Sequence, residues 1–365
     1  MDPSFDFILS QHARGAPKPF PLRNLPWSAV LFRGVGGIVA TTVLAGLLLG
    51  GCANEGGAKA KQAALARSAA TSALILVADT GNNRVVMMNT INGSGWREFG
   101  GSGKLNLPAG LALAADGKIY ITEKNGARVV RIDNILGGGQ ISYGNLGSGS
   151  GQFHSVAGVA LARDGKIYVA DAGNGRIVRM DDMSGAGWAQ YPPASGPVPH
   201  TFVSAGPGAI AVDGAGKIYL GLRDRIVRMD SIDGTGWTEY GTTGTGVGQF
   251  GNIQGLAIDG AGRILIADAA NDRIVRIDNL SGSGWAEFAG VKAAGSVAVD
   301  SSGHITIADT GNNRILQVGD ISGIALSSIG ALGATTGQFT GPAGVVLAAA
   351  AVVGTSAAPT TARQK

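Results

Sequence analysis

The sequence is poor in the residues that supply most covalent and ionic chemistry. It has one cysteine in 365 residues, Cys52, which excludes a disulfide within the chain. Histidine is scarce, with four residues, and only 15% of the residues are charged. The net charge is +4 and falls to +2 beyond residue 51, because the first 51 residues hold four basic and two acidic side chains. So weak a charge predicts no strongly charged partner and no nucleic acid.

Glycine is abundant instead, and it occurs in the turns of a repeated sequence phrase. The chain has 61 glycines, which suits many short strands joined by tight turns. The phrase reads as a strand, a turn on asparagine and a second strand that begins with arginine. It occurs as VADTGNNRVV at 77–86, VADAGNGRIV at 169–178, IADAANDRIV at 266–275 and IADTGNNRIL at 307–316, with degraded copies ITEKNGARVV at 121–130 and LGLRDRIV at 220–227. Six units at intervals of roughly 40 to 50 residues are typical of a propeller.

Each unit has the pattern of a four-stranded antiparallel meander. The third unit has four short runs rich in Val, Ile, Tyr and Trp, separated by Gly, Asp or Asn. These runs are GVALARD at 158–164, KIYVAD at 166–171, RIVRMD at 176–181 and GWAQYP at 187–192. The fold class is therefore predicted to be all-β, a six-bladed β-propeller of four-stranded antiparallel blades. In the second hairpin of each unit, asparagine is expected to adopt the left-handed conformation that closes the turn. The residues concerned are Asn82, Asn174, Asn271 and Asn312.

The two ends of the repeat region are predicted to close the ring. The phrase GPAGVVLA at 341–348 supplies an inner strand with no second strand after it, and LILVAD at 74–79 has no inner strand before it. Pairing of these N- and C-terminal strands would complete one blade and remove exposed sheet edges.

The phrases that lead into the inner strands carry a family resemblance. They read GSGSGQFHSVAGVAL at 147–161, GTGVGQFGNIQGLAI at 244–258 and GATTGQFTGPAGVVL at 333–347. Together with the strand-turn-arginine phrase, they resemble NHL repeats over residues 73–353. The resemblance implies a six-bladed NHL propeller. Similar propellers include SMP-30 or gluconolactonase-like hydrolases and streptogramin lyases, which hold a divalent metal or acid-base groups at the mouth of the central channel.

An aspartate and an arginine flank each intact turn on facing strands. A hydrogen-bonded ion pair that locks the hairpin accounts for this pattern, and its removal would leave a charge partly buried, at a cost of about 3 kcal/mol or more. The alternative is a ring of charges presented to a partner on one face. The pairs are Asp79 with Arg84, Asp171 with Arg176, Asp268 with Arg273 and Asp309 with Arg314.

Four tryptophans follow Gly-rich turns, each with a second aromatic residue three positions later. Residues three apart on a strand point to opposite faces, so each pair is expected to brace the blades on both sides of its own. A stacking platform for carbohydrates or bases is the alternative. The pairs are Trp96 with Phe99, Trp188 with Tyr191, Trp237 with Tyr240 and Trp285 with Phe288.

The expected inner strands offer little catalytic chemistry. They begin at Pro108, Ala157, Pro207, Gln254, Ala294 and Pro342, and almost all of these residues are apolar or small. The histidines of the repeat region, His154, His200 and His304, fall at non-equivalent places in their units. Channel sites for divalent metals need carboxylate, amide or imidazole groups that converge from several strands. We therefore expect no metal site and no cofactor, and the sequence identifies no catalytic residue.

Departures from the repeat cluster around the fourth unit. Its approach is a proline-rich insert at 191–206 (YPPASGPVPHTFVSAG), and its turn is shortened to residues 221–224. Such departures point to function or strain, and ordinary loop variation is the alternative. The second unit also departs, with Glu123 and Lys124 in place of the usual Asp and small residue. The insert is expected to expose a partner-binding patch of Tyr191, His200, Phe202 and Arg223.

The N-terminal region carries an export signal. Residues 34–49 (GVGGIVATTVLAGLLL) are apolar, are too short for a comfortable membrane span and follow Arg33. LGGC at 49–52 resembles the lipobox of bacterial lipoproteins, which implies cleavage before Cys52 and a lipid anchor on its thiol. An uncleaved anchor with a chance cysteine is the alternative. We expect a signal peptide at 1–51, a flexible tether at 52–72, the propeller at 73–353 and a disordered tail at 354–365.

These features predict a lipid-anchored, non-catalytic binding or scaffolding module of the bacterial cell envelope. Ala53 and Asn54 after the cysteine favour the periplasmic side of the outer membrane, if the host has one. The expected partners are the bilayer, through acylated Cys52, and a protein or glycan of the envelope, with the chain itself a monomer. The alternative function is a propeller lyase or lactonase, of the streptogramin lyase or gluconolactonase type, that uses loop residues.

Overall fold

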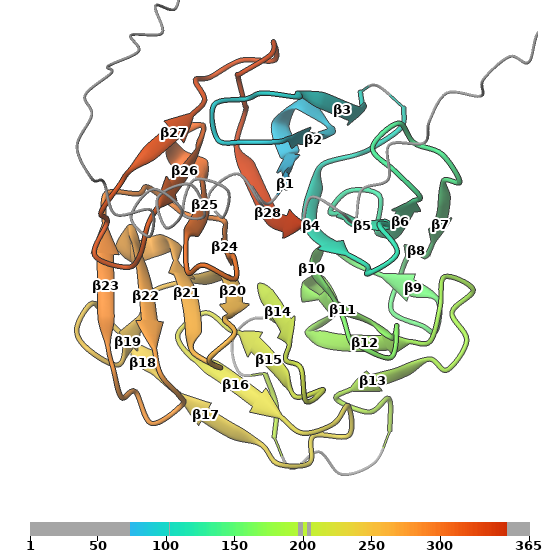
Figure 1. Cartoon of the computed structure of the whole chain (residues 1–365). Helices are drawn as coiled ribbons and strands as arrows, with labels where there is room; N and C mark the ends of the chain where they lie inside the picture. The colour runs from blue at the N-terminus through green and yellow to red at the C-terminus, as the bar shows by residue number, and fades with distance from the viewer. Residues whose placement is uncertain (1–73, 102, 196–199, 203–205, 349–365) are drawn as a thin grey trace, which may run out of the picture. The chain divides into compact units, whose positions relative to one another are not determined.

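The structure is a computed structural model that describes residues 74–101, 103–195, 200–202 and 206–348. These residues form six four-stranded antiparallel sheets arranged around a central axis (Figure 1). The predicted all-β propeller with six blades is confirmed. The expected signal peptide at 1–51, tether at 52–72 and tail at 354–365 lie outside the described residues, and so does Cys52.

Each blade contains four strands, which follow one another from the innermost to the outermost. Blade 1 has β28 (Pro342–Ala348), β1 (Leu74–Asp79), β2 (Arg84–Met88) and β3 (Arg97–Gly100). Blade 2 has β4 (Pro108–Leu113), β5 (Ile119–Glu123), β6 (Arg128–Ile132) and β7 (Ile141–Tyr143). Blade 3 has β10 (Val156–Leu161), β11 (Ile167–Asp171), β12 (Arg176–Met180) and β13 (Ala189–Tyr191).

The other three blades follow the same order. Blade 4 has β14 (Ala209–Val212), β15 (Ile218–Gly221), β16 (Ile226–Met229) and β17 (Thr238–Tyr240). Blade 5 has β20 (Ile253–Ile258), β21 (Ile264–Asp268), β22 (Arg273–Ile277) and β23 (Ala286–Ala289). Blade 6 has β24 (Ser296–Val299), β25 (Ile305–Asp309), β26 (Arg314–Val318) and β27 (Ser327–Ile329).

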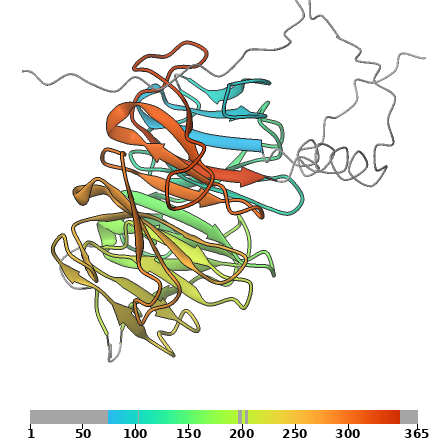
Figure 2. The same ribbon diagram turned by 60° about the vertical axis from the view of Figure 1, so that its left-hand side comes forward.

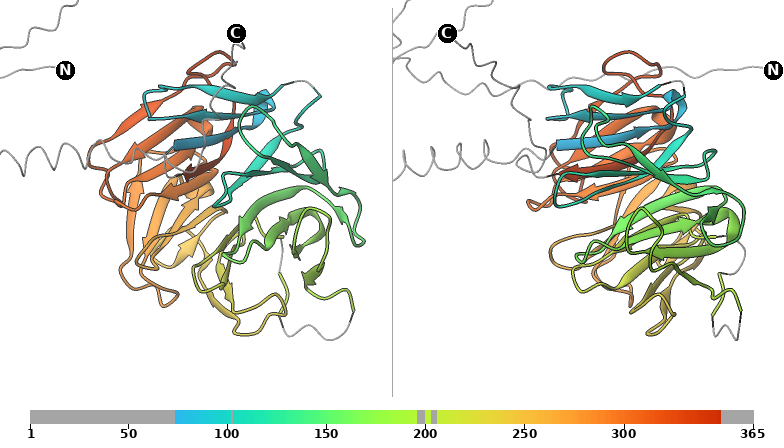
Figure 3. Two further views of the ribbon diagram at one scale, coloured as in Figure 1. Left: turned by 45° about the vertical axis from the view of Figure 1, so that its right-hand side comes forward. Right: turned by 90° about the vertical axis from the view of Figure 1, so that its right-hand side faces the viewer.

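The ring closes within blade 1, as the sequence predicts. Strand β28 pairs antiparallel with β1, from Leu74 opposite Ala348 to Asp79 opposite Pro342. Figure 2 shows the two strands side by side, and the views in Figure 3 agree. The two ends of the described chain thus share one sheet, in which β1 has a partner strand along both of its edges.

The hydrophobic core is divided among the six seams between adjacent blades. One cluster of buried side chains fills each seam, and aliphatic residues dominate every cluster. The tryptophan pairs behave as their spacing predicts. Trp188 packs into the seam between blades 2 and 3, while Tyr191 packs into the seam between blades 3 and 4. These aromatic side chains therefore join neighbouring blades.

Short 3-10 helices close the second hairpin of four blades, and one expectation about them is wrong. They are η1 (Thr80–Asn82), η2 (Ala172–Asn174), η3 (Ala269–Asn271) and η4 (Thr310–Asn312). The expected asparagines end these helices and are not left-handed; the next residue is, with φ of 53° at Asn83 and 62° at Gly175. Asp272 and Asn313 have the same role in the other two. A 3-10 turn needs right-handed residues throughout, so the reversal falls one position later.

Three of the six links between blades contain a small parallel contact that the sequence reasoning did not anticipate. Two are short sheets, β8 (Asn145–Leu146) with β9 (Gln152–Phe153) and β18 (Thr242–Thr243) with β19 (Gln249–Phe250). The third is a single bridge between Leu332 and Phe339. They lie in the three Gly-Gln-Phe phrases, which precede blades 3, 5 and 1.

Candidate functional site

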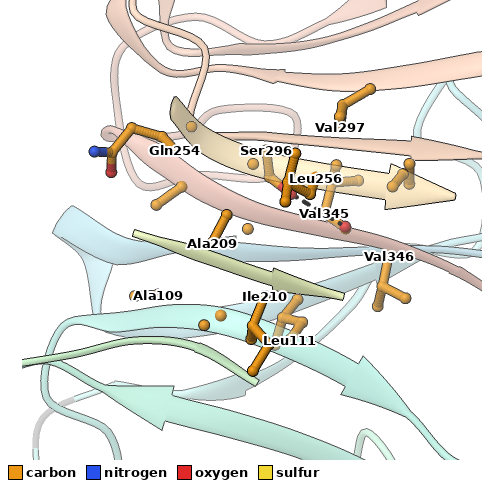
Figure 4. Close-up of a pocket in the computed structure, with 18 of the residues that line it drawn as sticks. Ala109, Leu111, Ala209, Ile210, Gln254, Leu256, Ser296, Val297, Val345 and Val346 are labelled. Atoms are coloured by element: carbon orange, nitrogen blue, oxygen red, sulfur yellow. Dashed lines mark hydrogen bonds between the residues drawn. The ribbon is translucent and has the colours of Figure 1, made fainter. Parts of the chain in front are cut away.

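The six inner strands surround a central channel, which is the first candidate site (Figure 4). Strands β4, β10, β14, β20, β24 and β28 all line a cavity of about 260 Å³. Its polar side chains are those of Lys124, Gln254 and Ser296, and the Ser296 hydroxyl lies 3.5 Å from the carbonyl oxygen of Val345. The larger apolar residues of the wall include Leu111, Val159, Ile210, Leu256, Val297 and Leu347. A wall of this kind suits the uncharged part of a ligand.

A second hollow, of about 470 Å³, lies at the end of the channel where the inner strands begin. It shares several lining residues with the channel, including Lys124 and Gln254, so the two spaces adjoin each other. We call this hollow the channel mouth. Among the described residues that line it, none is Asp or Glu. Its polar side chains are those of Lys124, Ser155, Arg223, Asn252 and Gln254.

Lys124 occupies a position that holds a threonine in two other blades. The hydroxyl of Thr80 donates to the carbonyl oxygen of Pro108 at 2.6 Å, and that of Thr310 donates to Pro342 at 2.7 Å. Those hydroxyls are thus satisfied inside the fold. Lys124 follows Glu123 at the end of β5, as Thr80 follows Asp79, and its half-buried side chain lines the mouth. The second unit's departure from the repeat therefore places a cation there.

Arg223 reaches the same mouth from the shortened turn of blade 4. Strand β15 ends at Gly221, and the backbone N–H of Leu222 donates to the carbonyl oxygen of Arg225 at 2.9 Å. This tight turn replaces the 3-10 helix found in four other blades and leaves the Arg223 side chain exposed. The adjacent Asp224 carboxylate is engaged by Arg225, which holds its pKa below the ordinary value.

The Asp and Arg side chains of the repeat are internal. Asp171 is fully buried, and its Oδ2 accepts from Nε of Arg176 at 2.7 Å. The same guanidinium donates to Ser148 and Gln152 carbonyl oxygens at 2.6 and 2.7 Å. Equivalent contacts join Asp79 to Arg84, Asp268 to Arg273 and Asp309 to Arg314. Because these carboxylates have no exposed surface, the arrangement fits the hairpin lock better than a charged ring offered to a partner.

The proline-rich insert folds its aromatic residues onto Trp237. The His200 ring stacks on this indole with a centroid distance of 4.7 Å and an interplanar angle of 8°, and Phe202 lies 6.0 Å from it. Beneath them, the Tyr191 hydroxyl donates to the carbonyl oxygen of His200 at 2.7 Å. We call His200, Phe202 and Trp237 the insert patch.

Two members of the expected patch are placed differently. Tyr191 is completely buried, because it fills the seam between blades 3 and 4, and this burial raises its pKa. Tyr191 contacts the insert patch through the hydrogen bond to the His200 carbonyl oxygen, but it is not exposed, contrary to the expectation. Arg223 lines the channel mouth and is not among the contacts of the aromatic group. The sequence reasoning therefore combined two separate surfaces.

The three histidines of the propeller lie in three different parts of the structure. His154 is exposed beside β10, His200 belongs to the insert patch, and His304 bonds to Asp300 at 2.8 Å in the first hairpin of blade 6. Within the part of the chain that the structure describes, no three or more His, Cys, Asp and Glu residues are grouped so that they could hold a metal ion. No helix in that part is long and apolar enough to cross a bilayer.

Sequence reasoning missed Lys124 and Asn252 as members of the channel mouth and Trp237 as the base of the insert patch. Lys124 stood out as a departure from the repeat, but its position next to the channel depends on the curvature of the whole ring. Trp237 carried no separate signal, because its phrase matches those of the other blades. Its distinct role comes from the insert, which brings His200 over its face.

Comparison with known protein families identifies the repeat. The sequence pattern of the NHL repeat matches residues 153–180, which run from the end of β9 through β12 in blade 3. The chain therefore carries an NHL repeat within a six-bladed propeller, as the repeated phrases indicate. No curated protein sequence matches the chain significantly.

Solved structures resemble the propeller over most of its length. A chain in the crystal structure of a nidogen/laminin complex matches with a TM-score of 0.59 and 18% identity, covering 76% of this chain and 98% of that one. A protein of unknown function from Bacteroides caccae gives 0.53 and 14%, with 76% and 99% covered. A streptogramin B lyase gives 0.50 and 14%, with 77% and 88% covered. At such low identity, the likeness establishes a shared fold alone.

Proposed function

We propose that this six-bladed propeller with an NHL repeat is a lipid-anchored, non-catalytic binding or scaffolding module of the bacterial cell envelope. The proposed anchor is a lipid on Cys52, which follows an apolar stretch and the LGGC phrase. One acyl chain binds a bilayer only marginally, and two or more hold a protein firmly. The proposed location is the periplasmic side of the outer membrane, where the host has one.

The insert patch is the observation that carries the binding role. Trp96, Trp188 and Trp285 each lie under an arginine of their own blade, at centroid distances of 5.3 to 5.6 Å. Trp237 instead lies under His200, which is exposed to solvent. The exposed His200 ring and the half-buried Phe202 and Trp237 rings offer flat faces for sugar rings or for the side chains of a partner protein. We therefore place the envelope protein or glycan at this patch.

The channel supports a binding role over catalysis. Its described wall is mainly aliphatic, and its one titratable lining residue is Lys124, without paired carboxylates or histidines beside it. Acid-base catalysis commonly uses His, Asp or Glu placed within hydrogen-bond reach of the substrate. The propeller lyase or lactonase remains the competing function.

Two experiments test the proposal. Cys52→Ala is expected to abolish incorporation of labelled fatty acid. An unlabelled wild-type protein would refute the anchor. For the partner, crosslinking in intact cells should give a specific product with wild type and with His304→Ala, but not with His200→Ala/Phe202→Ala.

The matched histidine control separates loss of the patch from a general effect of the substitution, because His304 is exposed in a distant hairpin. Identical crosslinked products from all variants would refute the patch. Turnover of a lactone or streptogramin by the purified protein, abolished by substitutions in the channel mouth, would favour the competing enzyme.

A further inference from the structure

We propose that the channel mouth binds a small anion with an apolar body, such as a medium-chain carboxylate. The cationic side chains of Lys124 and Arg223 would hold the anionic head, and the aliphatic channel would receive the body. This site is separate from the insert patch, so it goes beyond the binding role proposed above and can fail without it.

The charge of the mouth is unbalanced. Neither Lys124 nor Arg223 forms an ion pair with any described residue, whereas the carboxylates next to them in sequence are already engaged. Glu123 is fully buried and bonds to Arg128. Asp224 bonds to Arg225 at 3.0 Å and accepts from the Thr243 hydroxyl at 2.8 Å. Two cations that have no counterion among the described residues, at a concave hollow, attract an anion.

The same mouth offers an oriented neutral donor. The side-chain amide of Gln254 donates to Oδ1 of Asn252 at 3.0 Å. This contact fixes the Asn252 side chain and leaves its amide N–H groups without an acceptor among the described residues. A carboxylate can accept from such donors as well as from cations, and hydrogen bonds with one charged partner are stronger than neutral ones.

The residues that line the channel determine which kind of ligand body can bind there. Lys124, Ala157, Gly208 and Gln254 line both spaces, so two small residues and two long polar side chains border the boundary between the mouth and the channel. Beyond them, the cavity of about 260 Å³ is walled by side chains such as Ile210 and Leu256. Burial of each methylene against such a wall favours the complex, because apolar surface is removed from water. A chain of several carbons therefore complements this wall, and a second charge would not.

The test uses calorimetric titration of the full chain in mild detergent with hexanoate, hexanamide and acetate, each corrected by a protein-free blank. Hexanoate should bind at least about tenfold more tightly than hexanamide, which lacks the charge, and than acetate, which lacks the body. Lys124→Met/Arg223→Gln should weaken hexanoate binding by at least about tenfold. Lys292→Met should change it less than about twofold, because this exposed lysine lines neither hollow.

Each contrary result overturns a stated part of the proposal. Equal binding of hexanoate and hexanamide would exclude a role for the cations, and equal binding of acetate would exclude the channel as the apolar subsite. No binding of hexanoate at millimolar concentration, or equal losses in Lys292→Met and in the double variant, would overturn the site. Circular dichroism spectra and thermal midpoints matching wild type establish that both variants are folded.

Discussion

Arg176 lies over the indole ring of Trp188, 5.5 Å from its centroid, while the same guanidinium bonds to the loop that enters blade 3. Arg84 and Arg273 make the same set of contacts in blades 1 and 5. The arginines of blades 2, 4 and 6 are more exposed and contact fewer groups. Strong locks thus alternate with weaker ones around the ring, and they coincide with the three Gly-Gln-Phe links.

The first prediction concerns the strong lock. Arg176→Lys keeps the charge but loses the fork of donors that reaches Asp171 and the loop carbonyls. It should lower the free energy of unfolding by about 3 kcal/mol. Arg314→Lys, at a weaker lock, should cost about 1 kcal/mol. Guanidinium denaturation of the two variants measures the difference, and equal losses would contradict the alternation.

The second prediction concerns the phenylalanine of the Gly-Gln-Phe link. Phe250 is fully buried and packs 5.7 Å from Trp285 and 6.3 Å from Tyr240. Phe250→Ala should cost about 3 to 5 kcal/mol, because it opens a cavity in the seam between blades 4 and 5. Leu332→Ala, whose side chain is 68% exposed, should cost less than about 0.5 kcal/mol. Thermal unfolding distinguishes them; a large effect of the exposed leucine would count against this description of the core.

The third prediction concerns the left-handed residue after each 3-10 helix. Gly175→Asn should leave stability within about 0.5 kcal/mol of wild type, because asparagine tolerates φ of 62° and no atom lies within 4 Å of the added Cβ. Asn313→Val should cost about 2 kcal/mol, because valine resists positive φ and the bond from the Gly341 N–H to the Asn313 side chain, 2.8 Å long, is lost. Denaturation midpoints provide the measurement, and the reverse order of the two variants would refute the assignment.

The fourth prediction concerns alkaline pH. Burial raises the pKa of Tyr120 and Tyr168 above the ordinary value of 10.0. A raised pKa in the folded state means that this stability is complete below the unfolded pKa and is lost as the pH rises through the folded pKa. Tyr120→Phe/Tyr168→Phe should therefore lose less stability than wild type between pH about 8 and about 11. Unfolding midpoints at the two pH values test this, and parallel losses would show that these phenols do not contribute.

Much of the fold could be predicted from the sequence because six copies of one strand-turn-strand pattern indicate six similar blades. The strand phrases, the closing strands and the opposite faces of Trp188 and Tyr191 all follow from local periodicity and from the order of the units. The error over Asn82 arose because the sequence does not distinguish a simple turn from a 3-10 helix followed by a left-handed residue. The left-handed residue was therefore predicted one position too early in the chain.

The candidate sites were less accessible to sequence reasoning because they depend on contacts between units. Arg223 and Phe202 belong to the same unit, yet one faces the channel and the other packs on Trp237. Lys124 and Arg223 are about a hundred residues apart, and only the closed ring brings both to one hollow. The repeated phrases predict the blades. The positions of the residues that depart from the repeat can be compared only once the ring is folded.

The direction of β1 determines on which side of the ring the described chain begins. This strand begins at Leu74 and reaches the end of the channel that carries the mouth at Asp79, so the chain enters the ring at the opposite end. Strand β28 runs antiparallel and leaves the ring at that same end, at Ala348. The described chain thus begins at Leu74 and ends at Ala348 on the side of the ring opposite Lys124 and Arg223, so a partner bound near either of these end residues would leave the channel mouth free.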